Sequence, residues 1–205
     1  MNEPLEIEVK YLLYDITAIR NKILDAGWVS LGRNFESNIR FEDSLNGLKE
    51  KKQLLRLRQD CKSTLTFKSH VPFEDPRYKI LKELEVEVSC FHTMRSILTA
   101  LGFHEEQVYE KWRETFQAGT ALICLDQMPF ADFIEIEGGT NDIDSISQIL
   151  GFTPAQAITA NYLEIFSYIK NMENLDFTDV TFKNFQGATG DFIKHIRSFE
   201  STSIS

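Results

Sequence analysis

The sequence predicts a mainly β fold of the α+β kind, in which antiparallel strands close into a barrel with a few flanking helices. Two observations lead to this prediction. Eight segments alternate apolar and polar residues with the period of two that is typical of a half-buried strand. Only four segments place apolar residues at helical spacing, which is too few for the strand–helix alternation of a doubly wound sheet.

The eight predicted strands are long and follow one another through short connections. Successive side chains of a strand point to opposite faces, so each segment has one apolar and one polar face. We place these strands near residues 5–13, 28–43 (with a break), 53–60, 63–70, 79–89, 103–117, 120–127 and 132–138.

The predicted helices are recognised by an apolar stripe and, in three cases, by a glycine directly after the last turn. Asp15 has the residue type and position of an N-cap for the first of them. We expect helices over residues 16–26, 91–101, 143–150 and 161–170.

The composition is that of an acidic globular protein. The chain has 205 residues, a net charge of −9 and a pI near 5.0. This charge argues against a nucleic acid or a membrane surface as a partner, and the sequence has no run of about 18 apolar residues. Cys61, Cys90 and Cys124 are odd in number and lack the spacing of a zinc site. We therefore expect reduced thiols and a cytoplasmic protein.

Several predicted strands carry charges of one sign on their polar face. Glu6, Glu8 and Lys10 share a face of the first strand, and adjacent carboxylates repel each other unless a cation lies between them. A single strand of this kind is also typical of a solvated sheet face. Strands of one sign nevertheless favour a closed barrel whose charged faces line a water-filled lumen. The other charged positions are Arg56, Arg58, Lys68, Glu83, Glu85, Glu87, Lys111, Arg113, Asp126, Glu135 and Glu137.

Basic and acidic walls around one lumen suit a polyanion bound together with a metal ion. Arginine and lysine bind phosphate oxygens, and glutamates offer the oxygen ligands that Mg²⁺ and Mn²⁺ prefer. Phosphoryl transfer from a triphosphate depends on this kind of positioning and charge neutralisation. The sequence contains no glycine-rich phosphate loop that would indicate another type of phosphate site.

These charged motifs occur in the order found in one protein family. Over about residues 4–170 the chain resembles the CYTH domain, the triphosphate tunnel metalloenzyme family of class IV adenylyl cyclases, thiamine triphosphatases and inorganic tripolyphosphatases. The resemblance implies an eight-stranded antiparallel tunnel that binds a triphosphate end-on with a divalent metal. The motifs are Glu6-x-Glu8-x-Lys10, Leu55-Arg56-Leu57-Arg58, Leu65-Thr66-Phe67-Lys68, Glu83-x-Glu85-x-Glu87, Glu110-Lys111-x-Arg113, Phe133-x-Glu135-x-Glu137-Gly138 and the stretch from Ile158 to Glu164.

The resemblance also implies roles for individual residues. Glu6, Glu8, Glu135 and Glu137 correspond to ligands of Mg²⁺ or Mn²⁺. Glu85 and Asp126 lie near them in the family pattern and are the candidate catalytic residues. The candidate phosphate-binding residues are Lys10, Arg56, Arg58, Lys68, Lys111 and Arg113.

The chain departs from the family pattern at two places. An arginine of the family corresponds here to Leu81, so that either Lys79 or Lys82 replaces its phosphate contact or the contact is missing. The aromatic–Asp pair of the second strand corresponds here to Phe41-Glu42-Asp43.

Residues 1–170 are therefore expected to form the tunnel domain, and residues 171–205 a C-terminal extension. The extension contains Phe177, Phe182, Phe185, Phe192 and Phe199, too many apolar side chains for a simple disordered tail. We expect it to pack on the barrel or on a second subunit of a homodimer.

The leading functional hypothesis is a metal-dependent phosphohydrolase acting on tripolyphosphate, ATP or thiamine triphosphate. The second hypothesis is a class IV adenylyl cyclase, which makes cyclic AMP from ATP in the same kind of tunnel. A hypothesis of another class is a non-catalytic sensor that binds a nucleotide or polyphosphate. The complete set of acidic residues argues against the sensor, because basic residues alone would be enough to bind phosphate.

Overall fold

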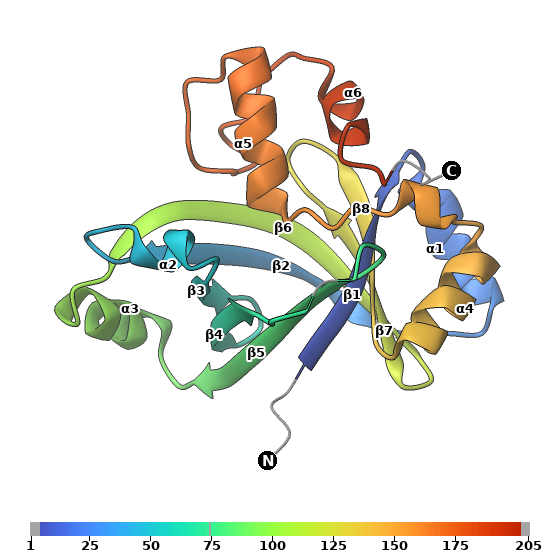
Figure 1. The fold of residues 1–205 in the computed structure, drawn as a ribbon, viewed down its shortest axis with the longest axis horizontal. Helices are drawn as coiled ribbons and strands as arrows, with labels where there is room; N and C mark the ends of the chain where they lie inside the picture. Colours follow the sequence, from blue (N-terminus) through green and yellow to red (C-terminus); the bar gives the residue numbers. More distant parts are fainter. Residues whose placement is uncertain (1–4, 74, 202–205) are drawn as a thin grey trace.

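Eight antiparallel strands form a closed ring in the computed structural model, which describes residues 5–73 and 75–201 (Figure 1). Their order around the ring is β1-β5-β4-β3-β2-β6-β7-β8, and the predicted antiparallel barrel is thereby confirmed. The strands are β1 (Leu5–Leu13), β2 (Val29–Glu42), β3 (Leu54–Gln59), β4 (Ser63–His70), β5 (Lys79–Val88), β6 (His104–Ala118), β7 (Ala121–Gln127) and β8 (Asp132–Glu137).

The ring is closed by β1, which pairs with β5 on one side and with β8 on the other. The longest ribbon joins β2 to β6, and its register shifts between Ser30 and Gly32 and again between Arg40 and Phe41. Gly32 has a φ of 115°, a conformation that side chains with a Cβ disfavour. This bulge is the break that the sequence predicts within residues 28–43.

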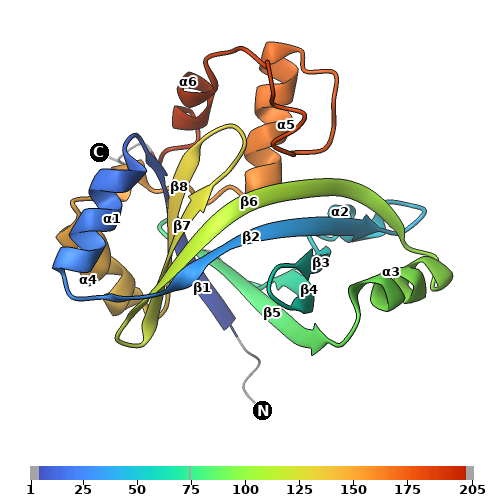
Figure 2. The ribbon, with the colours of Figure 1, turned by 180° about the vertical axis from the view of Figure 1, so that it is seen from behind.

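The helices lie outside the ring (Figures 1 and 2). The carboxylate of Asp15 accepts a hydrogen bond from the backbone N–H of Ala18 at 2.9 Å and caps the first helix as expected. The short α2 was not predicted, and the carboxylate of Glu42 holds its first turn by accepting from the N–H groups of Leu48 and Lys49. The helices are α1 (Ile16–Asp25), α2 (Gly47–Glu50), α3 (Phe91–Ala100), α4 (Thr140–Leu150), α5 (Tyr162–Glu173) and α6 (Phe192–Arg197), with a 3₁₀ turn at Pro154–Gln156.

Two apolar clusters bury the outer face of the sheet. Helices α1 and α4 pack on β1, β7 and β8; Ile23 of α1 and Ile143 of α4 belong to the same cluster as Ile136 of β8. Helix α3 covers β2 and β3 through Leu98, against Leu57. The outward rows of these strands are therefore the apolar rows, which leaves the charged rows for the interior.

A third apolar cluster closes the ring at the end of the charged interior. Leu12 and Phe133 continue the inward-facing rows of Lys10 and Glu135, but their side chains are apolar and buried. Tyr162 and Phe166 of α5 pack on them from above. We call Leu12, Phe133, Tyr162 and Phe166 the apolar end layer; it separates the charged lumen from the C-terminal helices.

The C-terminal segment lies on this layer. Val180 joins the free edge of β6: its N–H donates to the carbonyl of Val108 at 2.8 Å, and its own carbonyl accepts from Glu110 at 2.9 Å. Phe177, Phe185, Phe192 and Phe199 all pack into the third cluster. We propose that residues 171–205 form an extension, of which the described part, up to residue 201, packs most of its apolar residues against the same chain; the homodimer stays a prediction.

Replacing Phe185 tests this packing. Its ring contacts those of Phe130, Phe166, Phe177 and Phe192 at centroid distances of 5.0–6.0 Å. We expect Phe185→Ala to lower the free energy of unfolding in urea by about 2–3 kcal/mol, because it removes buried apolar area and leaves a cavity.

The control is Phe73→Ala, since Phe73 is 52% exposed. We expect its unfolding free energy to stay within about 0.5 kcal/mol of the parent. Equal effects of the two substitutions would contradict the proposed packing of the extension.

Candidate active site

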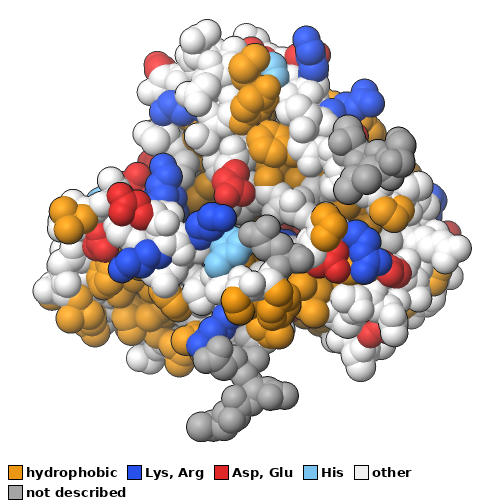
Figure 3. All heavy atoms as spheres, viewed as in Figure 1, with side chains coloured by type: hydrophobic (Ala, Val, Ile, Leu, Met, Phe, Trp, Pro, Cys, Tyr) orange, Lys and Arg blue, Asp and Glu red, His pale blue; other side chains and the backbone are white. Residues whose placement is uncertain are grey.

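The charged rows of the strands face a common cavity of about 1960 Å³ that extends from inside the ring to α5 and the β4–β5 connection. Basic and acidic side chains also gather in the band between α5 and strands β4 and β5, on the face seen in Figure 1 (Figure 3). Asp126 is the one candidate that does not line the cavity; it lies in the inward-facing row of β7, beside Phe133, and is fully buried. The cavity is lined by the other eleven, Glu6, Glu8, Lys10, Arg56, Arg58, Lys68, Glu85, Lys111, Arg113, Glu135 and Glu137.

Carboxylates crowd where β1 meets β8 and β5. Glu8 is the direct strand partner of Glu137, and Glu6 is bound by the ammonium of Lys68. Burial, together with the carboxylate of Glu8, raises the pKa of Glu6 to about 7. Burial and the same neighbour raise the pKa of Glu137. The carboxylates of this corner thus repel one another, as the spacing of Glu6 and Glu8 in the sequence predicts.

Lysine side chains compensate part of this negative charge. Lys79 Nζ lies 2.7 Å from Glu8 Oε1. Burial acts most strongly and raises the pKa of Glu8, but the ammonium groups of Lys79, Lys10 and Lys68 together outweigh it and the pKa is lowered. Of the two lysines considered as replacements at the Leu81 position, Lys79 is the one whose side chain lines the cavity.

Lys10 and Glu135 form a buried ion pair of the lumen. Lys10 Nζ lies 3.3 Å from Glu135 Oε1 and donates to the carbonyl of Ala160 at 2.9 Å. Burial lowers the pKa of Lys10. Burial would raise the pKa of Glu135, but Lys10 and Arg113 hold it well below its ordinary value. The lysine and arginine neighbours thus favour the ionised form of Glu135, whereas burial works against the ammonium form of Lys10.

Asp126 holds two of the candidate phosphate-binding residues. It accepts a hydrogen bond from Lys111 Nζ at 2.8 Å and another from Arg113 Nε at 2.6 Å. A third comes from the hydroxyl of Tyr162 at 2.8 Å. Arg113 Nη2 also contacts Glu135, so the guanidinium bridges two acids.

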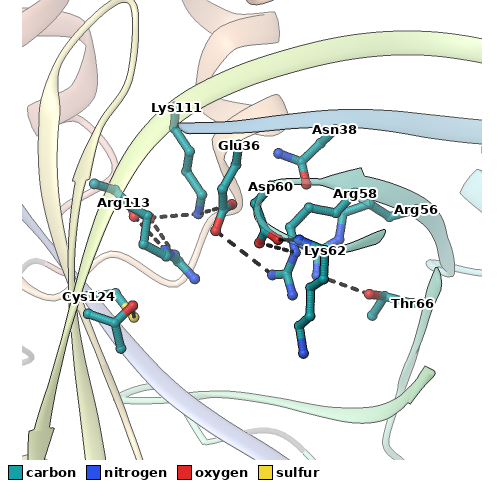
Figure 4. A network of polar contacts seen from close by, with 12 residues as sticks. Glu36, Asn38, Arg56, Arg58, Asp60, Lys62, Thr66, Lys111, Arg113 and Cys124 are labelled. Carbon is teal, nitrogen blue, oxygen red and sulfur yellow. Dashed lines mark hydrogen bonds and ion pairs between the residues drawn. The ribbon is translucent and has the colours of Figure 1, made fainter. Parts of the chain in front are cut away.

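The two arginines of β3 are held more loosely (Figure 4). Arg56 donates to Thr66 at 3.2 Å and to the hydroxyl of Tyr109 at 3.4 Å. Arg58 lies 3.3 Å from Asp60 and 3.6 Å from Glu85. The Nε atom of Arg56 is buried and has no hydrogen-bond partner among the described residues, whereas Arg58 Nε lies in the ion pair with Asp60. An unpaired buried donor such as Arg56 Nε calls for a bound anion or water.

Comparison with known proteins decides the family. The CYTH domain family matches residues 4–151, which is more than half of the chain. The protein belongs to the CYTH domain family. A Methanocaldococcus jannaschii protein named "putative adenylate cyclase" is 26% identical over 148 residues, which cover 71% of this chain and 83% of that protein.

Solved structures share the CYTH fold. A Vibrio parahaemolyticus protein, also named "putative adenylate cyclase", superposes with a TM-score of 0.71 at 20% identity and covers 81% of this chain and 99% of its own. A Hippeastrum protein described as a "putative adenylyl cyclase" with dominant triphosphatase activity has a TM-score of 0.58 at 16% identity, with 79% and 95% coverage. At these identities the likeness shows the fold alone.

The CYTH tunnel of this chain has a donor set suited to a hard divalent cation. In the described part of the chain, no three acidic, cysteine or histidine side chains are grouped closely enough to hold a metal without further ligands. Mg²⁺, however, is commonly held by one or two carboxylates together with substrate phosphates. The paired strand positions of Glu8 and Glu137, with Glu6 nearby, fit that arrangement, and a cation there would relieve their repulsion.

Sequence reasoning missed one acid of the site. Glu36 of β2 is buried, with Oε2 3.6 Å from Lys111 Nζ and Oε1 3.9 Å from Arg58 Nη1. Burial acts against ionisation, but Lys111, Arg113 and Arg58 lower the pKa of Glu36 to about 2. Its strand carries polar residues on both faces around this position, so alternation did not reveal which face is inward.

No helix among the described residues is long and apolar enough to cross a membrane.

Proposed function

We propose that this CYTH protein is a divalent-metal-dependent enzyme that hydrolyses a triphosphate bound in its tunnel. The observation that supports it best is the convergence of six candidate phosphate-binding cations from β1, β3, β4 and β6 on a cavity that also holds a carboxylate corner. Phosphoryl transfer depends mainly on positioning and charge neutralisation, which such walls supply. Tripolyphosphate, ATP and thiamine triphosphate are the candidate substrates.

Each wall has its own part in the proposed reaction. Arg56, Arg58 and Lys68 line the cavity and bind phosphate oxygens. Lys111 and Arg113, held by Asp126, bind a second part of the triphosphate. In this proposal Asp126 acts by positioning Lys111 and Arg113, because it is fully buried and its oxygens already accept hydrogen bonds.

The acidic residues hold the metal and orient water. Glu6, Glu8, Glu135 and Glu137 are the proposed ligands, and a bound Mg²⁺ or Mn²⁺ would neutralise negative charge on the phosphates. Glu85, which accepts from Thr66 at 3.0 Å, orients the attacking water. The water oxygen bonds to the terminal phosphorus, the bridging P–O bond breaks, and the water protons pass to solvent and product phosphate.

Adenylyl cyclase is the second candidate, because the Methanocaldococcus relative and the Vibrio structure both carry that name. In that reaction the ribose 3′-hydroxyl of ATP attacks the α-phosphate and pyrophosphate leaves. The two candidates share the tunnel and differ in the phosphorus atom that is attacked.

A substrate panel separates the candidates. The purified protein is given tripolyphosphate, ATP or thiamine triphosphate with Mg²⁺ or Mn²⁺, and phosphate, pyrophosphate and cyclic AMP are measured. We expect phosphate release without cyclic AMP. Cyclic AMP with pyrophosphate would favour the cyclase, and tight triphosphate binding without any product would favour the sensor.

A further inference from the structure

Tyr162 lies where the charged lumen meets the apolar end layer. Its ring packs edge-on against Phe133, with a centroid distance of 5.1 Å. Lys10 Nζ lies 4.2 Å from the centroid of the ring and Lys111 Nζ lies 5.3 Å from it. Its hydroxyl donates to Asp126 Oδ2 at 2.8 Å. One side chain therefore touches two candidate phosphate-binding lysines and the acid that holds one of them.

The two ammonium groups have little access to water. Lys10 is 2% exposed and Lys111 is 3% exposed. A buried ammonium needs partners that replace its hydration, and the face of an aromatic ring is one such partner. The ring does this without taking up an N–H donor in a strong hydrogen bond, so donors stay available for phosphate oxygens.

The position of Tyr162 is itself fixed by the helix that it begins. Asn161 caps α5: its side chain accepts from the N–H groups of Leu163 and Glu164, and its own backbone N–H donates to the Glu164 carboxylate. The preceding carbonyl, that of Ala160, accepts from Lys10. The start of α5 thus supplies Lys10 with a carbonyl and a ring face, from a part of the chain 150 residues away.

We propose that Tyr162 is a positioning residue of the triphosphate site: its hydroxyl on Asp126 and its ring beside Lys10 and Lys111 set these ammonium groups toward the bound phosphates. This inference rests on the proposed triphosphate site. It adds a residue of α5 to a site whose other proposed residues lie on the strands. Tyr162 itself transfers no proton and binds no phosphate in this proposal.

Three variants test the proposal. Tyr162→Phe removes the hydroxyl and keeps the ring, and Tyr162→Leu removes both. Tyr11→Phe is the matched control, because the buried Tyr11 hydroxyl donates to Ser147 at 3.1 Å on the outer face of β1. Binding of tripolyphosphate with Mg²⁺ is measured by calorimetry, and melting temperatures are recorded.

We expect Tyr162→Phe to weaken tripolyphosphate binding by a factor of about ten, the equivalent of about 1.4 kcal/mol. Tyr162→Leu is expected to weaken it further. Tyr11→Phe is expected to keep the parent affinity, although both Phe variants lower the melting temperature to a similar extent. Should Tyr162→Leu fail to fold, Tyr162→Phe decides the outcome.

A double-mutant cycle separates positioning from general support of the fold. If Tyr162 acts through Lys111, then Tyr162→Phe adds little to the loss of affinity that Lys111→Met already causes. Fully additive losses would overturn the inference, as would a Tyr162→Phe protein that binds tripolyphosphate like the parent. A parent protein that binds no triphosphate would instead overturn the proposed function, and the inference would fall with it.

Discussion

Glu8→Gln is expected to lower the turnover of the preferred triphosphate by about 10²–10³-fold, the cost of removing one preorganised charge from a phosphoryl-transfer site. Glu8 lies in the carboxylate corner beside Glu137 and is a proposed metal ligand. Glutamine keeps the shape of the side chain but cannot supply the negative charge that a divalent cation needs. Circular dichroism is expected to show an unchanged fold.

Metal removal is expected to have an even larger effect. Excess EDTA should abolish activity, and added Mg²⁺ or Mn²⁺ should restore it. The control variant for Glu8→Gln is Glu87→Gln, because Glu87 pairs with Lys62 and its side chain is 66% exposed. Full activity in excess EDTA would contradict the proposed role of the carboxylate corner.

Arg58→Ala and Lys111→Ala are expected to weaken triphosphate binding, each by about 1.5–3 kcal/mol, the worth of a hydrogen bond to a charged group. Arg58 lies on β3 and Lys111 on β6, so the two variants probe separate walls of the tunnel. Calorimetric titration with tripolyphosphate measures the loss.

Arg95→Ala is the control for these two variants. Arg95 pairs with Glu105 outside the tunnel, and its side chain is 45% exposed. Its removal should leave the affinity unchanged, since an exposed pair contributes little and lies away from the lumen. Unchanged affinity in both Arg58→Ala and Lys111→Ala would mean that the basic strands do not hold the substrate.

The strands and the charged lumen follow from local alternation, which is why the sequence predicts them. A residue such as Arg56 is followed by an apolar neighbour and then by Arg58, so its face is readable without any partner. The order of the strands around the ring was not predicted, because it depends on pairing between distant segments. The roles of the individual residues stay predictions until the variants are measured.

The features that were missed depend on contacts between distant parts of the chain. Helix α2 has only four residues and depends on Glu42, which lies outside it. Glu36 shares its strand with polar residues on both faces. Tyr162 looks like an ordinary apolar residue at the start of a helix, because Asp126 and the lysines that it touches come from other strands.

The closure of the ring by β1 also bears on how the chain folds. Leu5 pairs with Lys82 and Glu8 pairs with Glu137, so β1 is synthesised well before either of its partner strands. Pairing over such separations is slow, because the loop-closure entropy is lost before the contacts form. During this interval β1 has two unpaired edges, which makes it a candidate for aggregation. Charged residues protect such edges, so Glu6, Glu8 and Lys10 are expected to keep the nascent β1 from pairing with other chains.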